Sequence, residues 1–416
     1  MAEDQERPAW AERLRQERLA RDWSQSDVVA AMRTFAEVPL PEGLLDQWKR
    51  WERGRNRPDE FYRPLIAATF GTVVESIFGE DRPPTGRRGT TDELLIGRSG
   101  MDTHELVQRI RQSSVTDHTL DALALTVEQL CCDYASRDPF SLITESREWL
   151  TRLTGLLDQR LTLAQHRDVL DAAGWLTLLV GCLEYDTGQA RTAEATRVAA
   201  LELGKEADNN SVVAWAHEMR AWFALTHGRF REVIAAAQAG QDAAPGRSVA
   251  VQLLGQEAKA WARMGNQRNV VRALEKGRVL LDSLPYPERP DNHFVVDPDK
   301  FDFYAMDCYR LIGDDKLADM HAREIIRKTT NADGTSNAPM RNAEARLTLG
   351  VVAARRGDLA QAAAHGQEAL AIERRSQPSL LMIGKELDEV LRQRYGAEPE
   401  AAEFHDALVE AARGAA

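Results

Sequence analysis

The sequence lacks the long apolar stretches that cross membranes. No run approaches the roughly 18 consecutive apolar residues that a transmembrane helix requires. The first six residues are polar and acidic, so we expect no secretory signal there. Hydrophobic residues make up 43% of the chain and charged residues 28%, which is typical of a globular protein. We therefore expect the protein to lie in the cytoplasm.

Cysteine is scarce as well, with four residues in 416. Cys131, Cys132, Cys182 and Cys308 show neither a C-x-x-C spacing nor histidine-rich surroundings that would indicate zinc. The adjacent pair Cys131 and Cys132 falls inside an apolar helical pattern. We predict buried free thiols and no metal site.

Recognisable catalytic motifs are also absent. The chain has no phosphate-binding G-x-x-x-x-G-K-S/T, no nucleophile elbow G-x-S-x-G and no H-E-x-x-H. Its nine histidines are scattered, and none stands near a Ser or Cys and an acid at a known catalytic spacing. We therefore predict a protein that is not an enzyme and that uses no cofactor.

Positive charge is concentrated in one short segment. The whole chain has a formal charge of -12, which argues against a protein that coats nucleic acid with its entire surface. Residues 49–57 nevertheless hold five basic side chains against Glu52 alone, a net charge of +4. This local patch is compatible with contacts to phosphate.

The basic segment lies in a predicted helix with two aromatic anchors. Trp48 and Trp51 are three residues apart and fall on one helical face, which leaves Lys49, Arg50 and Arg53 facing outward. Gly54 can end the helix in the left-handed conformation. A reader of the DNA major groove needs both an apolar anchor and positive charge, so we predict a recognition helix here.

Further short helices surround this one and form a predicted domain of residues 1–80. Apolar spacing predicts helices over residues 9–21, 24–35, 61–70 and from 74, in addition to the helix that begins near Leu44. Ser24, with Asp27 three positions later, has the pattern of a capping box. Pro and Gly exclude a helix through residues 37–43.

These residues resemble a known DNA-binding family. Ser24 and Gln25, the apolar second helix and the run Trp51-Glu52-Arg53-Gly54-Arg55 followed by Pro58 are similar to the phage-repressor-type helix-turn-helix domain, the Xre or Cro/C1 family. The resemblance covers roughly residues 10–79. In place of the short turn that the family has between its second and third helices, this chain inserts residues 35–43.

The resemblance implies specific roles for several side chains. It places Gln25 at a phosphate, Leu45, Asp46, Gln47, Lys49 and Arg50 toward the groove, and Arg18 with Glu52 in an internal ion pair. Arg50 can make a bidentate contact to guanine, and Asp46 could accept from a cytosine amine. Lys49, Arg53 and Arg55 are expected at phosphates, which orient a protein on DNA without reading its sequence.

The remainder of the chain reads as helices with an internal repeat. Residues 81–101 are rich in Pro, Gly and charge and are predicted to be a linker. Residues 102–165 are predicted to be a helical connecting and dimerisation region, residues 166–398 a repeat domain, and residues 399–416 a C-terminal helix and tail. In the repeat domain, glycines separate pairs of apolar helical runs at Gly188, Gly228, Gly265, Gly313 and Gly357.

Small residues recur at fixed distances from these glycines. Seven before, five after and twelve after each glycine, most positions hold Gly, Ala or Val, although Met306 and Ile325 break the pattern in the fourth unit. This resembles the tetratricopeptide repeat. The spacings of 40, 37, 48 and 44 residues between the glycines exceed the family's unit of about 34. The resemblance implies a right-handed solenoid with a concave groove.

In the consensus register, the first helix of each unit lines that groove. The exposed groove positions would then hold Trp175, Tyr185, Trp215, Glu218, Trp222, Lys259, Arg263, Asp307, Arg310 and Glu344. Aromatic residues mixed with both charges suit a peptide or a small molecule. Tryptophans at helical spacing also occur simply as packing residues, and this interpretation stays open.

The sequence therefore predicts an all-α protein with a five-helix helix-turn-helix domain and a tetratricopeptide-like solenoid. This architecture resembles transcriptional regulators that include the bacterial peptide-pheromone-responsive group. We expect a homodimer on double-stranded DNA, because one such domain buries too little surface for selective binding. Two alternatives remain: an adaptor that binds only proteins through both domains, and an enzyme regulated in cis.

Overall fold

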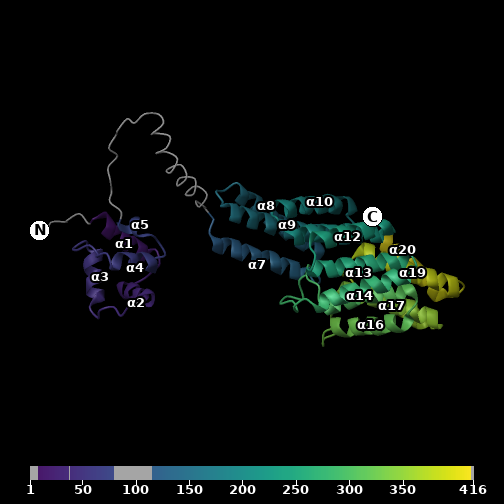
Figure 1. The fold of residues 1–416 in the computed structure, drawn as a ribbon. Helices are drawn as coiled ribbons and strands as arrows, with labels where there is room; N and C mark the ends of the chain where they lie inside the picture. The colour runs from purple at the N-terminus through teal and green to yellow at the C-terminus, as the bar shows by residue number, and fades with distance from the viewer. Residues whose placement is uncertain (1–7, 37, 79–114, 414–416) are drawn as a thin grey trace. The chain divides into compact units, whose positions relative to one another are not determined.

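The computed structural model describes residues 8–36, 38–78 and 115–413. These residues are helical and contain no β-strand (Figure 1), so the prediction of an all-α fold is confirmed for them. The chain divides into two compact units, residues 1–99 and residues 100–416. The predicted linker at residues 81–101 lies outside the described residues, as do residues 102–114 of the predicted connecting region.

The first unit consists of short helices packed around one aromatic core. They are α1 (Ala9–Leu19), α2 (Gln25–Phe35), α3 (Leu44–Glu52), α4 (Tyr62–Thr69) and α5 (Val74–Phe78). The helix α3 packs against α1 and α2, and α4 packs against α2 and α5. The predicted helices agree with these bounds to within about two residues, because local signals such as the Ser24 cap of α2 and the glycines after α3 and α4 delimit them.

The predicted capping box at the start of α2 is present. The Ser24 hydroxyl accepts from the backbone N–H of Asp27 at 3.2 Å, and the backbone N–H of Ser24 donates to the Asp27 carboxylate at 2.8 Å. Val28, Val29 and Met32 then form the buried face of the helix. Phe35, which the sequence pattern assigned to the same apolar face, is 55% exposed at the helix end.

The second unit is built from longer antiparallel helices. They are α7 (Asp117–Asp133), α8 (Pro139–Leu157), α9 (Leu163–Asp186), α10 (Ala190–Glu206), α11 (Asn210–Thr226), α12 (Phe230–Ala243), α13 (Ser248–Arg263), α14 (Gln267–Asp282), α15 (Pro298–Ile312), α16 (Asp315–Thr329), α17 (Pro339–Arg356), α18 (Leu359–Leu370), α19 (Gln377–Tyr395) and α20 (Pro399–Arg413). Each helix from α8 onward packs against the next one along the chain (Figure 1).

The repeat glycines lie at the turns between paired helices. Gly188, Gly228, Gly265, Gly313 and Gly357 have φ angles of 83°, 72°, 70°, 80° and 94°. A residue with a Cβ rarely adopts this left-handed conformation, so the turn requires glycine. The small residues at fixed distances from these turns are buried. A Cβ on Gly277, for example, would stand 2.5 Å from Cε2 of Phe301.

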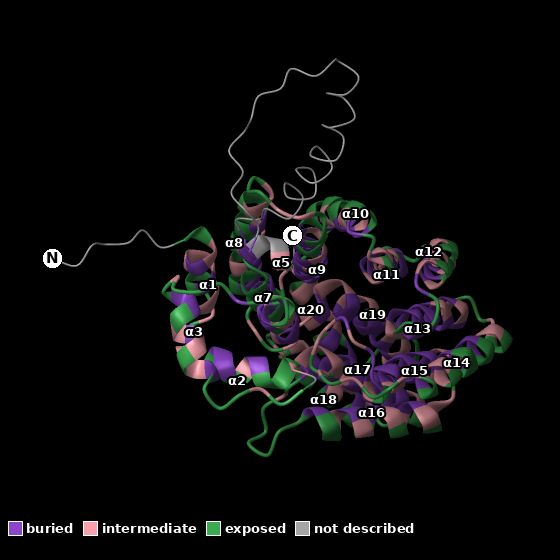
Figure 2. Ribbon diagram, turned by 60° about the vertical axis from the view of Figure 1, so that its left-hand side comes forward, coloured by how far each residue is buried: buried purple, intermediate pink, exposed green. Residues whose placement is uncertain are grey.

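The first helices of successive pairs turn their buried faces inward. In Figure 2, α13, α15 and α17 are largely buried, whereas α14 and α16 carry exposed residues on their outer sides. The helix α19 contacts α9 and α11 as well as α17, so the last pair returns to the first pairs. The Trp222 indole N–H donates to the Ser379 hydroxyl at 3.0 Å across this closure. The curved row of helices therefore encloses an interior.

Candidate DNA-binding surface and ligand cavity

Two tryptophans fix α3 to the first unit. Trp48 and Trp51 are 0% and 1% exposed, as their spacing predicted. Their rings meet edge to face with centroids 6.2 Å apart, and Trp51 lies 4.9 Å from the ring of Tyr62. Each pair of this kind adds about 0.5–1.5 kcal/mol to the effect of burial alone. These contacts fix the orientation of α3 in the first unit, so its opposite face points to the outside.

The helix ends in the predicted glycine turn. Gly54 has a φ of 74°. Its N–H donates to the carbonyl of Trp51 at 2.8 Å, and the N–H of Arg55 donates to the carbonyl of Arg50 at 3.0 Å. This pair of hydrogen bonds defines a Schellman motif. The chain therefore leaves the helix sharply and carries Arg55 and Asn56 along an exposed turn.

The internal ion pair implied by the family resemblance is present. The Arg18 Nε donates to the Glu52 carboxylate at 2.7 Å, and Arg18 also donates to the carbonyl of Trp23 at 2.8 Å. Gln25 donates its side-chain amide to the second oxygen of Glu52. Gln25, expected at a phosphate, thus joins α2 to α3 in this structure.

Three arginines on the outer side of α3 and its exit turn have no protein partner. Arg50, Arg53 and Arg55 are exposed, and their guanidinium groups form no hydrogen bond or ion pair within the described part of the chain. Lys49 instead forms an ion pair with Asp46 at 3.0 Å. The hydrogen bond from Lys49 is the main cause that lowers the pKa of Asp46, so that carboxyl stays ionised.

Two further residues that the resemblance places toward the groove are less exposed than these arginines. Gln47 is half-buried on α3, and Leu45 is half-buried against the aromatic core. The inserted segment also joins this core, because Leu40 packs against it. The insertion therefore has an apolar anchor of its own, on the chain between α2 and α3.

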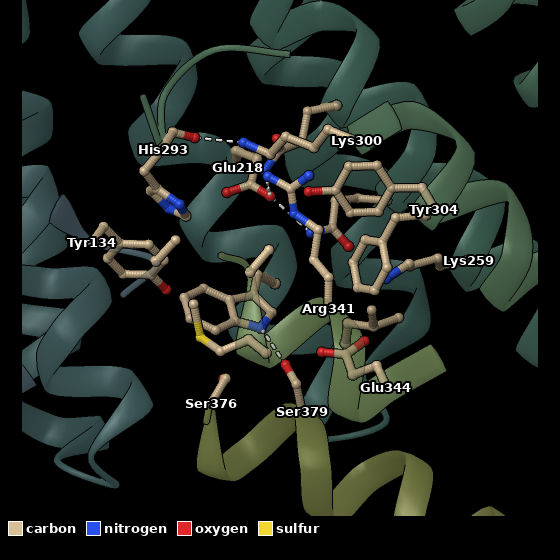
Figure 3. A pocket seen from close by; sticks show the side chains of 18 of the residues that line it. Tyr134, Glu218, Lys259, His293, Lys300, Tyr304, Arg341, Glu344, Ser376 and Ser379 are labelled. Atoms are coloured by element: carbon tan, nitrogen blue, oxygen red, sulfur yellow. Dashed lines mark hydrogen bonds between the residues drawn. The ribbon is translucent and has the colours of Figure 1, made fainter. Parts of the chain in front are cut away.

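The second unit contains a cavity of about 120 Å³ on the inner side of the curved helices. Its wall is formed by α11, α13, α15, α17 and α19, together with the end of α7 and residues 291–293 of the connection before α15 (Figure 3). The helices are the first members of their pairs, as the consensus register implied. The cavity lies where the closure brings α19 against α11.

Glu218 is a buried carboxyl in this wall. It is 4% exposed, and one of its carboxylate oxygens accepts from the amides of Gln252 and Gln256, both at 2.7 Å. Burial raises the pKa of Glu218, and these hydrogen bonds offset part of the rise. The carbonyl oxygens of the two glutamines are buried without a partner in the described residues.

Two lysines in the cavity are engaged by the protein. The Lys259 Nζ lies 4.7 Å from the centre of the Tyr304 ring and 3.8 Å from the Asp307 carboxylate. The Lys300 Nζ donates to the carbonyls of His293 and Val295, at 2.5 and 3.1 Å. Burial, followed by the nearby charge of Arg341, lowers the pKa of Lys300 to about 7.

An aromatic pair closes the side of the cavity nearest α7. The rings of Tyr134 and His293 have centroids 3.7 Å apart. The Tyr134 hydroxyl donates to Asp186 at 2.7 Å, and Arg374 donates to the carbonyl of Tyr134 at 2.8 Å. Burial and the charge of Lys300 lower the pKa of His293 well below its usual value, so its ring is neutral near pH 7.

The cavity gathers four of the ten predicted groove residues: Glu218, Trp222, Lys259 and Glu344. Tyr185 and Arg263 line a neighbouring pocket between α9, α11, α13 and α19. Trp175 lies in another pocket beside α7, where its ring is 5.5 Å from that of Phe294. Seven of the ten predicted groove residues are therefore distributed over three hollows.

The expected exposure is wrong for seven of the ten groove residues, which are buried: Tyr185, Trp215, Glu218, Lys259, Asp307, Arg310 and Glu344. Trp215, Asp307 and Arg310 are 1%, 0% and 1% exposed. Trp215 packs edge to face against Phe294 from the long connection, with centroids 5.2 Å apart. The connection folds back over the first helices, and a register taken from the repeats alone cannot show this.

Asp307 and Arg310 belong to a buried ion network. Arg263 donates to Asp307 at 2.9 Å and to Glu386 at 3.0 Å, and Arg310 contacts the same two carboxylates. Although burial alone would raise it, Arg263 and Arg310 hold the pKa of Asp307 well below its usual range. Because Glu386 lies on α19, this network joins α13 and α15 to the closing helix.

Several cavity residues were missed by the sequence pattern. They are Tyr134, Gln252, Gln256, His293, Lys300, Tyr304 and Arg341. Two of them, Gln252 and Lys300, stand at a repeat position that the sequence could have indicated. Thirteen residues before the five loop glycines stand Trp175, Trp215, Gln252, Lys300 and Glu344, so the register that selected the two tryptophans and Glu344 also includes Gln252 and Lys300.

The predicted state of the cysteines is confirmed: all four are free and buried. Burial raises the pKa of the Cys132 thiol to about 12. The residues that the structure describes contain no group of His, Cys, Asp and Glu side chains that could hold a metal ion. None of their helices is long and apolar enough to span a membrane.

Comparison with known proteins adds no assignment. No protein-family model matches the chain, and a search of curated proteins found no match. The functional interpretation therefore depends on the surface of α3 and on the cavity.

Proposed function

We propose that this protein is a sequence-specific DNA-binding transcriptional regulator of the Xre type. In this proposal α2 and α3 act as the helix-turn-helix, with α3 in the major groove. The second unit is a tetratricopeptide-like domain that dimerises and senses a small ligand. Two copies of the first unit would contact two half-sites about one helical turn of DNA, or a multiple of it, apart.

The observation that carries the proposal is the set of unpaired arginines beside α3. Arg50, Arg53 and Arg55 expose guanidinium groups without a partner in the described residues, although the chain as a whole has a charge of -12. In a chain with excess carboxylates, cations left unpaired on one small surface are available for a polyanion. Each phosphate that they neutralise releases counterions, which drives binding.

The arginines have different expected contacts. Arg50 lies in the last turn of α3, on the side away from the buried tryptophans, and its planar guanidinium suits the O6 and N7 acceptors of guanine. Arg53 and Arg55 lie at the helix end and in the exit turn, where phosphates are the expected partners. Lys49 remains paired with Asp46 in the free protein, so its phosphate contact requires a rearrangement.

The sensor role is supported by the cavity in the second unit. Its wall is formed by the first helices of five successive pairs, so an occupant would contact α11, α13, α15, α17 and α19 together. A ligand that binds better to one curvature of the row would shift the equilibrium between curvatures. We expect this shift to be coupled to DNA affinity by about 1–3 kcal/mol.

Binding to labelled genomic fragments at several salt concentrations tests this function. Regulation through DNA predicts a small set of retained fragments and an affinity that falls steeply as salt rises. An adaptor that binds only proteins predicts no retained fragment and no salt slope. The same titration with Arg50→Ala is expected to reduce affinity for the retained fragments by about 1–3 kcal/mol.

A further inference from the structure

Two side chains of α17 face the cavity without a protein partner. Arg341 and Glu344 are three residues apart, which places them on one face of the helix, and both line the cavity (Figure 3). No hydrogen bond or ion pair joins the Arg341 guanidinium or the Glu344 carboxyl to any residue that the structure describes. They do not pair with each other, although a spacing of three residues permits such a pair.

The other charged groups of the inner wall are occupied. Glu218 accepts from two glutamines, Lys259 lies against aromatic rings and near Asp307, and Lys300 donates to two carbonyls. The guanidinium and the carboxyl on α17 therefore differ from them in being available. A charged group in a mostly buried position is costly unless a partner is supplied.

Part of the cavity wall is apolar. Trp222, Leu225, Phe303, Met340 and Met382 contribute to the wall of the cavity. Its volume of about 120 Å³ is close to that of the engineered cavity of about 150 Å³ that binds benzene. A single ring with short substituents fits this space.

We propose that the cavity binds a small organic acid with an apolar ring and a hydroxyl or amino donor, whose anionic group pairs with Arg341 and whose donor bonds to Glu344. This names the effector class of the proposed sensor and rests on the proposed function only for its effect on DNA. The planar guanidinium presents two parallel donors that match the two oxygens of a carboxylate.

The raised pKa of the Glu344 carboxyl is consistent with a missing hydrogen-bond donor. Burial raises the pKa of Glu344 to about 7, and the charge of Lys259 offsets only part of the rise. A hydroxyl or amino group of the ligand would supply that donor. The buried carbonyl oxygens of Gln252 and Gln256, also without partners among the described residues, offer further acceptors in the same cavity.

Calorimetric titration of the full chain with three probes tests the proposal. The probes are 4-hydroxyphenylacetate, its neutral amide 4-hydroxyphenylacetamide, and phenylacetate, which lacks the hydroxyl. We expect the hydroxy acid to bind about tenfold or more tightly than its amide, because a charge-assisted bond is lost. Phenylacetate is expected to bind about three- to tenfold more weakly than the hydroxy acid.

Two variants assign these differences to the two side chains. In Arg341→Met the acid and the amide are expected to bind equally, whereas Arg356→Met at the exposed end of the same helix should preserve the wild-type ratio. In Glu344→Met the hydroxy acid and phenylacetate should bind equally. Because both probes are titrated into the same variant, the ratio of their affinities does not depend on the stability of that variant.

Three results would overturn the proposal. They are the absence of millimolar or tighter binding of all three probes, equal binding of acid and amide to the wild type, and an unchanged ratio in Arg341→Met. The comparison of acid and amide binding to the wild-type chain tests the proposal even if a variant does not fold. Because no DNA is present, failure of DNA binding would leave the calorimetric result intact, and the converse also holds.

Discussion

The two units of the molecule use arginine in opposite ways. Beside α3, Arg50, Arg53 and Arg55 are exposed and have no partner within the described residues. In the second unit, Arg263 and Arg310 are almost fully buried and share Asp307 and Glu386. The same side chain is thus left unpaired at the surface of one unit and joins helices inside the other.

The difference follows from the cost of removing charge from water. A buried guanidinium must have carboxylates around it, whereas an exposed one keeps its hydration until a ligand replaces the water. Arg341 falls between these cases, because it is half-buried in the cavity wall and lacks a carboxylate partner. Partner and exposure together therefore separate the arginines that join helices from the arginines that we propose as ligand contacts.

Removing the centre of the buried network should produce the largest effect. Asp307→Asn leaves Arg263 and Arg310 without their shared carboxylate. We expect a loss of about 3–5 kcal/mol in the free energy of unfolding, measured with urea. Glu324→Gln, which removes only exposed ion pairs on α16, should cost less than about 1 kcal/mol. Equal losses would contradict the assigned role of the network.

The unpartnered carboxyl of the cavity predicts a pH dependence. The folded pKa of Glu344 is about 7 against an ordinary value of 4.5, so between these values the folded state binds more protons and stability falls as pH rises. Glu344→Gln should remove this fall, by at most about 3 kcal/mol across the window. The measurement is urea unfolding of both proteins at a series of pH values.

A second group titrates in the opposite direction. The pKa of Lys300 is about 7 in the fold against 10.5, so from pH 7 to 10.5 the unfolded state binds more protons and stability rises with pH. Lys300 is present in both proteins, so the difference in unfolding free energy between the wild type and Glu344→Gln should change with pH only below about pH 7. A difference that grows above pH 8 would contradict the assignment.

Packing between the repeats predicts a smaller loss. A methyl group on Gly277 would meet the ring of Phe301 at 2.5 Å, so Gly277→Ala should destabilise the second unit by about 1–3 kcal/mol. Gly155 on α8 has open space around it, and Gly155→Ala should stabilise by about 0.5–1 kcal/mol through helix propensity. Thermal unfolding of both variants measures the contrast.

The exposed arginines predict effects on binding with little effect on stability. Arg50→Ala should weaken binding to the selected DNA by about 1–3 kcal/mol and relax discrimination at one base position. Arg53→Ala should weaken all sequences about equally and reduce the salt slope by about one. Titration of matched and mismatched duplexes separates them. Equal loss on all sequences from both variants would show that the base contact is assigned to the wrong residue.

Local signals in the sequence predicted most helices, including α3 with its start at Leu44 and its buried face at Trp48 and Trp51. Periodicity and caps act over a few residues, which explains this success. The repeat register likewise predicted the buried small residues and the turn glycines.

The cavity was only partly predictable because it depends on distant segments. His293 reaches it from the long connection, and Ser379 and Met382 reach it through the return of α19 to α11. Neither event follows a periodic pattern. Gln252 and Lys300, by contrast, share the register position of Glu344 and could have been found by applying that register to every repeat.

Selection of bound duplexes from a random pool shows most directly whether α3 reads DNA with its unpaired arginines. If it does, we expect enrichment of a two-fold symmetric site whose affinity falls linearly with the logarithm of salt concentration. Recovery of no preferred sequence, with retention that does not respond to salt, would contradict it.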